Sequence, residues 1–326
     1  MSVPGAEARP LVVIAGPTGS GKSALALSLA ERFDGEIVNF DSLQIYLGFD
    51  IGTAKLSIAE RRGIPHHLMD VCAPTETVTA GDYARMARRV LEEIAARGRL
   101  PVLVGGTGFY LRALLDGLAP GPGRDEALRR RLEAREAKRE GSLHRLLRRF
   151  DPATAGRIHP RDVQKLVRAV EICLLARRPA ARVFEAGRDA LRGWQALKLA
   201  LDPPRAELHQ RIHQRTEKMF QTGLVDEVRS LLASGVPESA KPFEAIGYRQ
   251  ALAVAKSGMA VEEAIVSTEV ATRQYAKRQW TWFRREPGIQ WLQGFGEAPA
   301  VASAAFRATH SFVELFARIK REFTEQ

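Results

Sequence analysis

The chain has 326 residues, of which 45% are hydrophobic and 27% charged, a composition typical of a globular protein with two domains or with one domain that carries a large insertion. Its 49 Lys and Arg against 38 Asp and Glu give a formal net charge of +11, which favours a polyanionic partner but also fits a merely soluble surface. Two cysteines exclude a disulfide framework, the opening sequence MSVPGAEARP has no apolar signal core, and the apolar runs are too short to cross a bilayer, so we expect a cytoplasmic protein without membrane contact.

Residues 1 to 120 alternate between strand and helix patterns. Short apolar runs predict strands, and two longer segments carry apolar residues at helical spacing, the second with Gly98 as a stop signal. Alternating strands and helices build a parallel sheet with right-handed crossovers, and these strands lack a polar face, so we expect an α/β fold with helices on both sides of the sheet. The expected strands are 11–15, 36–40, 67–71 and 101–104, and the expected helices are 22–33 and 80–97.

The pattern changes after the turn-forming sequence Pro-Gly-Pro-Gly at 120–123. From 124 to about 185 only arginine-rich helical patterns occur, with breaks at Gly141, Asp151-Pro152 and His159-Pro160. An apolar run at 194–202 then predicts a strand that returns the chain to the sheet, and helices follow at about 205–220, 223–234 and 260–285. We therefore expect a core at 1–123 and 193–296, an all-α insertion domain at 124–192, and a tail at 297–326 with an amphipathic helix.

The positive charge is concentrated in two segments. Residues 124–192 hold 19 Lys and Arg against 10 Asp and Glu, and residues 273–285 hold five Lys and Arg and no acid, whereas the remainder has a net charge of −3. Localised charge of this kind indicates a nucleic-acid contact. A solvated helix surface with Glu–Arg pairs explains the first segment equally well, and the tryptophans in the second indicate that part of it packs as helix core.

The sequence GPTGSGKS at 16–23 matches the phosphate-binding pattern G-x-x-x-x-G-K-[ST], between an expected strand and an expected helix. Glycines let backbone N–H groups curl around a phosphate, and the helix N-terminus adds positive potential. In this pattern Lys22 reaches the terminal phosphate and the Ser23 hydroxyl binds Mg²⁺. The sequence therefore predicts a P-loop NTPase-like core whose phosphate or diphosphate site is formed by Gly16, Pro17, Thr18, Gly19, Ser20, Gly21, Lys22 and Ser23.

A strand-end acid is missing beside this loop. In P-loop NTPases a further strand usually ends in an Asp that holds Mg²⁺, but here the run PVLV leads directly into Gly-Gly-Thr-Gly at 105–108, which argues against ATP hydrolysis. A carboxylate instead follows the second expected strand, at Asp41, and the carboxyl ends of parallel strands face the ligand crevice. Asp41 is therefore a candidate general base, with a turn or helix-cap residue as the alternative.

Two pairs of side chains on the expected helix 205–220 have open roles. Arg211 and Arg215 are either solvated charges or a phosphate clamp. His209 and His213 lie four residues apart, but neither a Glu between them nor a third ligand nearby completes a zinc site.

Eight sequence strings follow one another in a specific order over about residues 11–292. They are GPTGSGKS (16–23), DSLQIY (41–46), DIGTAK (50–55), PHHLMD (65–70), GGTGFYLRALLDGL (105–118), RIHPRDVQKLVRAVEI (157–172), IGYRQ (246–250) and ATRQYAKRQWTW (271–282). Together they resemble the tRNA dimethylallyltransferases, also called isopentenyl-diphosphate:tRNA transferases. The departures are mild, with Ser23 where Thr is commoner and Phe109 where Leu is, and the tail after Phe295 has no usable counterpart.

The resemblance implies transfer of the five-carbon allyl group of dimethylallyl diphosphate to the exocyclic amine of the adenine 3′-adjacent to a tRNA anticodon, which gives isopentenyladenosine. It implies Mg²⁺ as the cofactor, no hydrolysis of ATP, and a phosphate loop that holds the diphosphate leaving group. The basic insertion would then hold the anticodon stem-loop of the tRNA. We expect a monomer, because no segment marks a surface for self-association.

The resemblance also assigns roles to individual residues. Asp41, Thr107 and Lys22 are carried over as catalytic residues, and the loop 16–23 with Arg215 forms the diphosphate site, in which Ser23 is the Mg²⁺ ligand. Arg273, Gln274, Lys277 and Arg278 are expected to line a channel shared by both substrates. The remaining contacts to tRNA fall on Asp41, Ser42, Leu43, Gln44, Thr107, Arg129, Gln164, Lys165, Leu166, Val167 and Arg168.

Two other functions are open at this point. A small-molecule kinase with Asp41 as the base for a hydroxyl group would consume ATP and would not need the basic insertion. A non-catalytic RNA-binding protein that uses a nucleotide as a switch would keep its activity when Asp41 is replaced.

Overall fold

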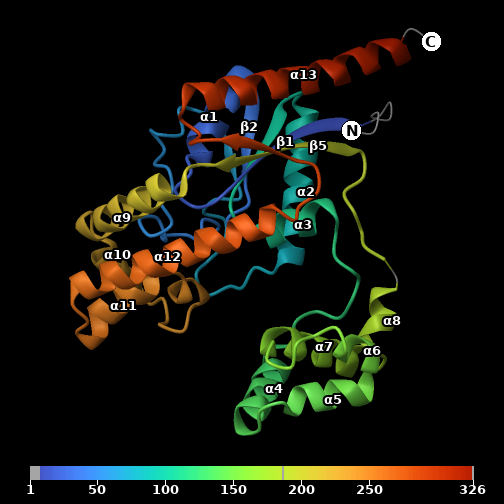
Figure 1. Cartoon of the computed structure of the whole chain (residues 1–326), viewed down its shortest axis with the longest axis vertical. Coiled ribbons are helices and arrows are strands. Elements are labelled where there is room, and N and C mark those ends of the chain that lie inside the picture. The colour runs from blue at the N-terminus through green and yellow to red at the C-terminus, as the bar shows by residue number, and fades with distance from the viewer. Residues whose placement is uncertain (1–7, 186, 325–326) are drawn as a thin grey trace. The chain divides into compact units, whose positions relative to one another are not determined.

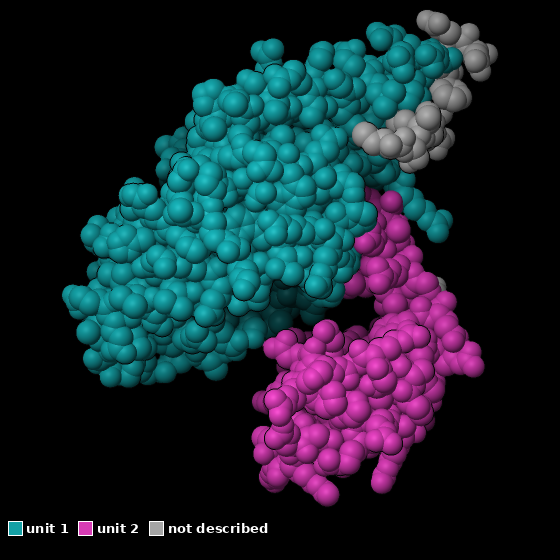
Figure 2. All heavy atoms as spheres, viewed as in Figure 1, with its two compact units in different colours: residues 1–114, 192–326 teal, residues 115–191 magenta. Residues whose placement is uncertain are grey.

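The computed structural model describes residues 8–185 and 187–324. The first seven residues and the last two, which belong to the expected core and tail, lie outside the described residues, as does residue 186 of the expected insertion. The chain forms two compact units, residues 1–114 with 192–326 and residues 115–191 (Figure 2). The second unit contains the segment from 124 onward that we expect to be an insertion, and it is described separately below.

The first unit is built on a sheet in which every strand pairing is parallel. Its strands are β1 (Arg9–Ala15), β2 (Gly35–Asn39), β3 (His66–His67), β4 (Leu100–Val104), β5 (Trp194–Asp202) and β6 (Ile289–Gln293). Over the described residues the order is β3-β2-β4-β1-β5-β6, with Val13 of β1 opposite Leu103 of β4 and Lys198 of β5. The predicted α/β class with a P-loop NTPase-like parallel sheet is confirmed.

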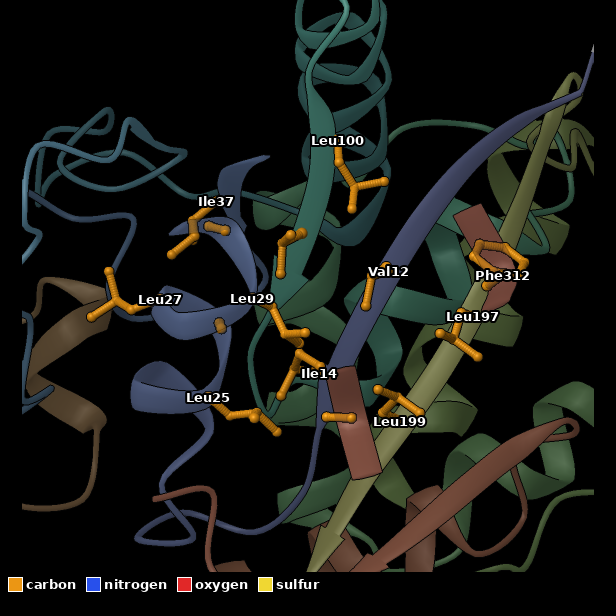
Figure 3. Close-up of a cluster of buried hydrophobic side chains, with 14 of the residues drawn as sticks. Val12, Ile14, Leu25, Leu27, Leu29, Ile37, Leu100, Leu197, Leu199 and Phe312 are labelled. Carbon is orange, nitrogen blue, oxygen red and sulfur yellow. The ribbon is translucent and has the colours of Figure 1, made fainter. Parts of the chain in front are cut away.

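One face of the sheet is covered by two helices from opposite ends of the chain, α1 (Lys22–Arg32) and α13 (Pro299–Thr324). The two helices contact each other, and α13, drawn in red, also contacts β1, β5 and β6 (Figure 1). Phe312 of α13 packs in one buried cluster with Val12 of β1 and Leu197 of β5 (Figure 3). The C-terminal tail therefore supplies part of the hydrophobic core beneath the strands that lead into the phosphate loop.

The other face of the sheet is covered by α2 (Ala80–Ala96), which contacts β2 and β4. Leu11 and Val13 are fully buried, and since side chains alternate along a strand they point to the face opposite Val12. The helix begins at a capping box, in which Thr79 and Asp82 each accept a hydrogen bond from the backbone N–H of the other. It ends just before Gly98, whose φ of 70° is the left-handed conformation expected of a stop signal.

Further helices follow β5 and pack beside the carboxyl ends of the strands. They are α9 (Arg205–Gln221), α10 (Leu224–Ala233), the 3₁₀ helix η1 (Lys241–Glu244), α11 (Tyr248–Ser257) and α12 (Val261–Phe283). Phe49, from the long connection after β2, packs against Phe243 and Tyr248, with its ring centroid 4.7 Å from that of Tyr248. These helices therefore anchor the loop that carries Asp41. Although α12 and α13 are long, no described helix is apolar enough over a sufficient length to cross a membrane.

The expected strand 67–71 is wrong in extent, because β3 covers only His66–His67. Leu68 and Asp70 have φ angles of 59° and 54°, which a β-strand cannot contain. Asp70 instead accepts a hydrogen bond of 2.5 Å from the Lys55 ammonium, which also donates to Asp50 at 2.8 Å. This buried lysine ties together two segments of the connection after β2.

The sequence patterns do not predict four elements of the structure, which are α3 (Gly108–Leu115), η1, α11 and β6. β6 is a partly exposed edge strand that pairs with β5, so its five residues lack the continuous apolar run of the central strands. α3 begins inside the Gly-Gly-Thr-Gly sequence, and because glycines are typical of loops, this sequence does not indicate the start of a helix.

The second unit is a small helical bundle. Its helices are α4 (Glu126–Lys138), α5 (Ser142–Phe150), α6 (Pro152–Ala155), α7 (Val163–Ala176) and α8 (Ala180–Phe184). Asp125, Asp151 and Asp162 cap α4, α6 and α7 by accepting backbone hydrogen bonds from their first turns. The buried core includes Leu143 and Leu147 of α5 with Leu166 and Val170 of α7.

Candidate active site

The carboxyl ends of β1, β2 and β4 open into a cavity of about 470 Å³. The phosphate loop follows β1, Asp41 follows β2, and Gly105 follows β4, and all three line the cavity. The walls also include Arg215 of α9 and Gln279 of α12. This is the position at which parallel α/β sheets bind their ligands.

The phosphate loop turns sharply from β1 into α1. Gly16 and Gly21 have φ angles of 139° and 84°, which side-chain-bearing residues rarely adopt. A β-carbon at Gly16 would also lie 3.1 Å from the backbone oxygen of Leu201 on β5. The two glycines therefore let the chain pass close to the neighbouring strand and begin α1 at the wall of the cavity, where the free N–H groups of a first helical turn attract anions.

Lys22 is the first residue of α1, and its ammonium donates a hydrogen bond of 2.7 Å to the carbonyl of Pro17 within the loop. Burial lowers the pKa of Lys22 to about 7, Asp41 opposes that change, and Arg215 adds to it. Burial also lowers the pKa of Arg215, which Asp41 partly restores. The cavity thus holds cationic groups that lack a sufficient counter-charge, which is the electrostatic condition for binding an anion.

Asp41 lies at the turn that follows β2 and lines the cavity. Its backbone N–H donates to the side-chain oxygen of Asn39 at 2.9 Å, and its Oδ1 accepts a hydrogen bond from the N–H of Leu43 at 2.9 Å. One carboxylate oxygen therefore holds the turn, while the side chain faces Lys22 and Arg215 closely enough to influence the pKa of each. The turn role considered for this residue is therefore observed, and its reactive role stays a prediction.

Thr107 connects the Gly-Gly-Thr loop to the loop of Asp41. Its hydroxyl accepts a hydrogen bond from the N–H of Ser42 at 3.1 Å and donates to the Ser42 hydroxyl at 3.2 Å. Within the described part of the chain, Asp41 and Gln44 line the cavity but Ser42, Leu43 and Thr107 do not. Thr107 is thus placed beside Asp41 and orients its loop.

Gln279 of α12 joins the two sides of the site. Its side-chain oxygen accepts a hydrogen bond of 2.8 Å from the N–H of Thr18 in the phosphate loop, and its amide nitrogen donates one of 3.0 Å to the carbonyl of Gly106. Only 4% of Gln279 is exposed; its hydrogen bond to Gly106 is buried, and the one from Thr18 is partly buried. One side chain therefore sets the separation between the phosphate loop and the Gly-Gly-Thr loop.

The same face of α12 explains why the Gly-Gly-Thr-Gly sequence needs its glycines. A β-carbon at Gly106 would overlap the Gln279 amide, and one at Gly108 would overlap the ring of Trp282. Tyr275, four residues before Gln279, lines the cavity, and burial raises the pKa of its hydroxyl. Residues 275, 279 and 282 thus form one stripe of the helix against the loop.

This stripe differs from the set expected from sequence. Tyr275 and Gln279 line the cavity, whereas among the described residues Arg273, Gln274, Lys277 and Arg278 do not. Gln274, Lys277 and Arg278 are exposed on another face of α12, and Arg273 pairs with Glu269. The i, i+4 spacing shows that Tyr275 and Gln279 share one face of the helix. The sequence alone does not show whether that face points toward the cavity.

The residues expected to contact tRNA from the second unit fall into three groups. Gln164 and Lys165 are exposed at the start of α7. Leu166 and Val167 are fully buried in the core of the unit, so their side chains hold α7 in place and offer no surface to an RNA. Arg129 and Arg168 both pair with the buried carboxylate of Glu171, at 3.2 and 2.7 Å, so two positive charges share one negative charge.

A parallel sheet that presents a phosphate loop and a carboxylate to one cavity is the arrangement of an enzyme acting on a phosphorylated small molecule. Comparison with known proteins narrows this class. A family model described as IPP transferase matches residues 44–286. A tRNA dimethylallyltransferase from Solibacter usitatus is 58% identical over 304 residues, which cover 93% of this chain and 99% of the relative. The chain therefore belongs to the IPP transferase family.

Other relatives agree with this assignment. A tRNA dimethylallyltransferase from Koribacter versatilis is 51% identical over 91% of this chain and 97% of its own length. The crystal structure of a tRNA isopentenylpyrophosphate transferase from Bacillus halodurans, 34% identical, has a TM-score of 0.69 over 97% of this chain and 99% of its own. A eukaryotic dimethylallyltransferase described as acting on tRNA, 28% identical, has a TM-score of 0.81 over 94% of this chain and 80% of its own. The resemblance carried by the eight sequence strings is thus confirmed.

Replacing Gln279 with Leu should cost about 1–3 kcal/mol in the free energy of unfolding, because it leaves a buried carbonyl of Gly106 and a partly buried N–H of Thr18 without their side-chain partner. Urea unfolding measures this loss. Gln274→Leu, on an exposed position of the same helix, is the matched control and should change the free energy of unfolding by less than about 0.5 kcal/mol. Equal unfolding free energies for the two variants would contradict the role assigned to Gln279.

The low pKa of Lys22 predicts pH-dependent binding of inorganic diphosphate. Without a bound anion, Lys22 loses its proton as the pH rises through about 7. A bound diphosphate favours the charged form, so above pH 7 binding takes up a proton. The affinity for diphosphate should therefore fall by up to about tenfold per pH unit above 7. Calorimetry in the presence of EDTA, in buffers of different ionisation enthalpy, measures both effects. Lys22→Arg stays protonated, so its affinity should follow only the titration of the ligand; the same pH profile in both proteins would exclude Lys22 as the titrating group.

Proposed function

We propose that this protein transfers the dimethylallyl group of dimethylallyl diphosphate to the exocyclic amine of the adenine 3′-adjacent to the anticodon of a tRNA, with release of diphosphate. The observation that carries the proposal is the single cavity onto which both the phosphate loop and Asp41 face. Relatives named tRNA dimethylallyltransferase and a structural neighbour described as acting on tRNA support the choice of group and acceptor.

The cationic side of the cavity suits a diphosphate leaving group. When the allylic C–O bond breaks, its electron pair stays on the diphosphate oxygen. Lys22, Arg215 and the first turn of α1 face the cavity and stabilise this developing charge. The N–H of Thr18 is already bonded to Gln279, so the N–H groups nearest the start of α1 are the ones we assign to the diphosphate.

Mg²⁺ is part of the proposal, and the oxygen ligands on the cavity fit it. Mg²⁺ is usually held by one or two protein oxygens together with substrate phosphates. Within the described residues, no group of three or more His, Cys, Asp and Glu side chains is placed to hold a metal, so the substrate oxygens have to complete the coordination. Ser23, whose side chain lies on the cavity wall, would hold the ion beside the diphosphate, where it would neutralise charge on the leaving group.

The opposite side of the cavity suits the acceptor. The lone pair of the exocyclic nitrogen forms the new N–C bond, and the nitrogen then gives up a proton. The Leu43 N–H holds Oδ1 of Asp41, so we assign the proton to Oδ2. Thr107 and Ser42 keep this loop in place, and the buried Gln279 keeps it at a fixed separation from the diphosphate site.

The second unit supplies the surface for the tRNA. Its residues 124–191 hold 18 of the 49 basic residues of the chain, and RNA binding depends strongly on contacts between basic side chains and phosphates. A groove of about 560 Å³ in this unit is lined by His144, Arg148, Arg157 and His159. The acceptor adenine has to leave its stack to reach the cavity.

The two cysteines are buried and form no disulfide, which suits the reducing cytoplasm. We propose that the protein works there as a monomer.

Incubation of the full chain with radiolabelled dimethylallyl diphosphate, Mg²⁺ and unmodified tRNA tests the proposal. We expect label in the tRNA, one diphosphate released per label, and no consumption of ATP. A tRNA with guanine in place of the adenine 3′ of the anticodon is the control and should stay unlabelled. ATP consumption without label would identify a small-molecule kinase, and RNA binding with neither reaction would identify a nucleotide-switched RNA-binding protein.

Asp41→Asn should lower turnover by about 10²- to 10⁴-fold with little change in tRNA affinity, because the amide keeps the shape of the turn but cannot accept the proton. Single-turnover transfer and filter binding measure the two quantities. Asp226→Asn, at an exposed position on α10, is the control and should behave like the unaltered protein. Unchanged turnover of Asp41→Asn would exclude Asp41 as the base.

A further inference from the structure

Arg211 lies one helical turn before Arg215 on α9 and lines the same cavity. Its guanidinium pairs with the carboxylate of Glu297, with its Nη1 atom 3.1 and 3.2 Å from the two oxygens, and it lies over the ring of Phe295 at 3.9 Å from the ring centroid. Arg211 is therefore a cavity-lining cation whose observed counter-charge comes from a residue outside the phosphate loop.

Glu297 reaches the cavity from the segment between β6 and α13. Its carboxylate lies against Gly21, where a β-carbon would overlap it, and Gly21 is the residue immediately before α1. The N–H of Gly296 donates a hydrogen bond of 2.9 Å to the carbonyl of Ser20, which fixes this segment on the phosphate loop. In the free protein a carboxylate thus stands at the start of α1, where an anionic ligand is expected to bind.

We propose that Arg211 binds the diphosphate of the allylic donor and that Glu297 occupies Arg211 until the donor replaces it. This inference rests on the proposed function, since it assigns two further residues to its donor site. The diphosphate and the Glu297 carboxylate compete for the same guanidinium and for the same end of α1. Glu297 therefore weakens donor binding, and Arg211 strengthens it.

The exposure of the Arg211–Glu297 ion pair is consistent with replacement of Glu297 by a diphosphate. The side chains of Arg211 and Glu297 are 41% and 46% exposed, and an ion pair this exposed is weak in water. A diphosphate offers several oxygens to the planar guanidinium, which binds such groups in bidentate fashion. The cavity is also lined by Lys22, Arg215 and Lys218. These cations attract a diphosphate more strongly than they attract the Glu297 carboxylate, because the diphosphate carries more negative charge.

Binding of inorganic diphosphate, measured by calorimetry on the full chain, tests the proposal without tRNA. We expect Arg211→Gln to weaken binding by about tenfold or more and Arg211→Lys to weaken it less. Glu297→Gln should tighten binding by about three- to tenfold. In the Arg211→Gln background the Glu297→Gln change should have a smaller effect, because the pair it disrupts is already absent.

One matched variant and one kinetic readout complete the experiment. Arg229→Gln, which removes one partner of an exposed pair on α10, should leave diphosphate binding and thermal unfolding unchanged. In the transfer reaction, Arg211→Gln should raise the KM for dimethylallyl diphosphate and leave the KM for tRNA unchanged.

Four results would overturn the inference. Diphosphate binding by Arg211→Gln equal to that of the unaltered protein would remove Arg211 from the donor site. Weaker binding by Glu297→Gln only when Mg²⁺ is present would identify Glu297 as a cation ligand. If the unaltered protein transfers the allyl group while all variants bind diphosphate alike, this inference alone fails; if the unaltered protein binds diphosphate but transfers nothing, the proposed function fails and this inference with it.

Discussion

The side-chain amide of Gln279 satisfies a backbone donor of the phosphate loop and a backbone acceptor of the Gly-Gly-Thr loop at the same time. Because the amide is buried, its hydrogen bond to Gly106 cannot be exchanged for water without cost. The length of one glutamine side chain therefore limits how far apart the two loops can move. Gly106 has to be glycine for the amide to fit, and α12 has to approach the end of β4 closely.

Groups of opposite charge line the cavity beside these two loops. Lys22 and Arg215 are cations whose pKa values burial lowers, so the cavity without a ligand is short of negative charge. Asp41 offsets that deficit only in part, and β4 is followed by glycines where ATP-hydrolysing P-loop proteins carry a metal-binding Asp. The arrangement suits a reaction in which a diphosphate leaves on one side while an amine loses a proton on the other.

The local patterns of the sequence predict the sheet and the phosphate loop well, because buried parallel strands are continuous apolar runs and the strand 194–202 matches β5. They fail where a contact between distant segments decides the structure. Leu68 and Asp70 adopt positive φ angles because Asp70 holds Lys55, which ends β3 early. Whether Tyr275, Gln279 and Glu297 line the cavity depends on how α12 and the segment after β6 are placed. Whether Leu166 and Val167 are buried depends on which face of α7 packs against the rest of its unit. A motif identifies such stretches but not which of their side chains point to the site.

The central claim is that one cavity holds the diphosphate against the phosphate loop with the allyl group directed toward Asp41. A crystal structure of the full chain with the unreactive thiolodiphosphate analogue of dimethylallyl diphosphate tests it most directly. The account predicts diphosphate oxygens on Lys22, Arg215 and the first turn of α1, with the allylic carbon on the side of Asp41. A diphosphate bound outside the loop 16–23, or an allyl group directed away from Asp41, would contradict it.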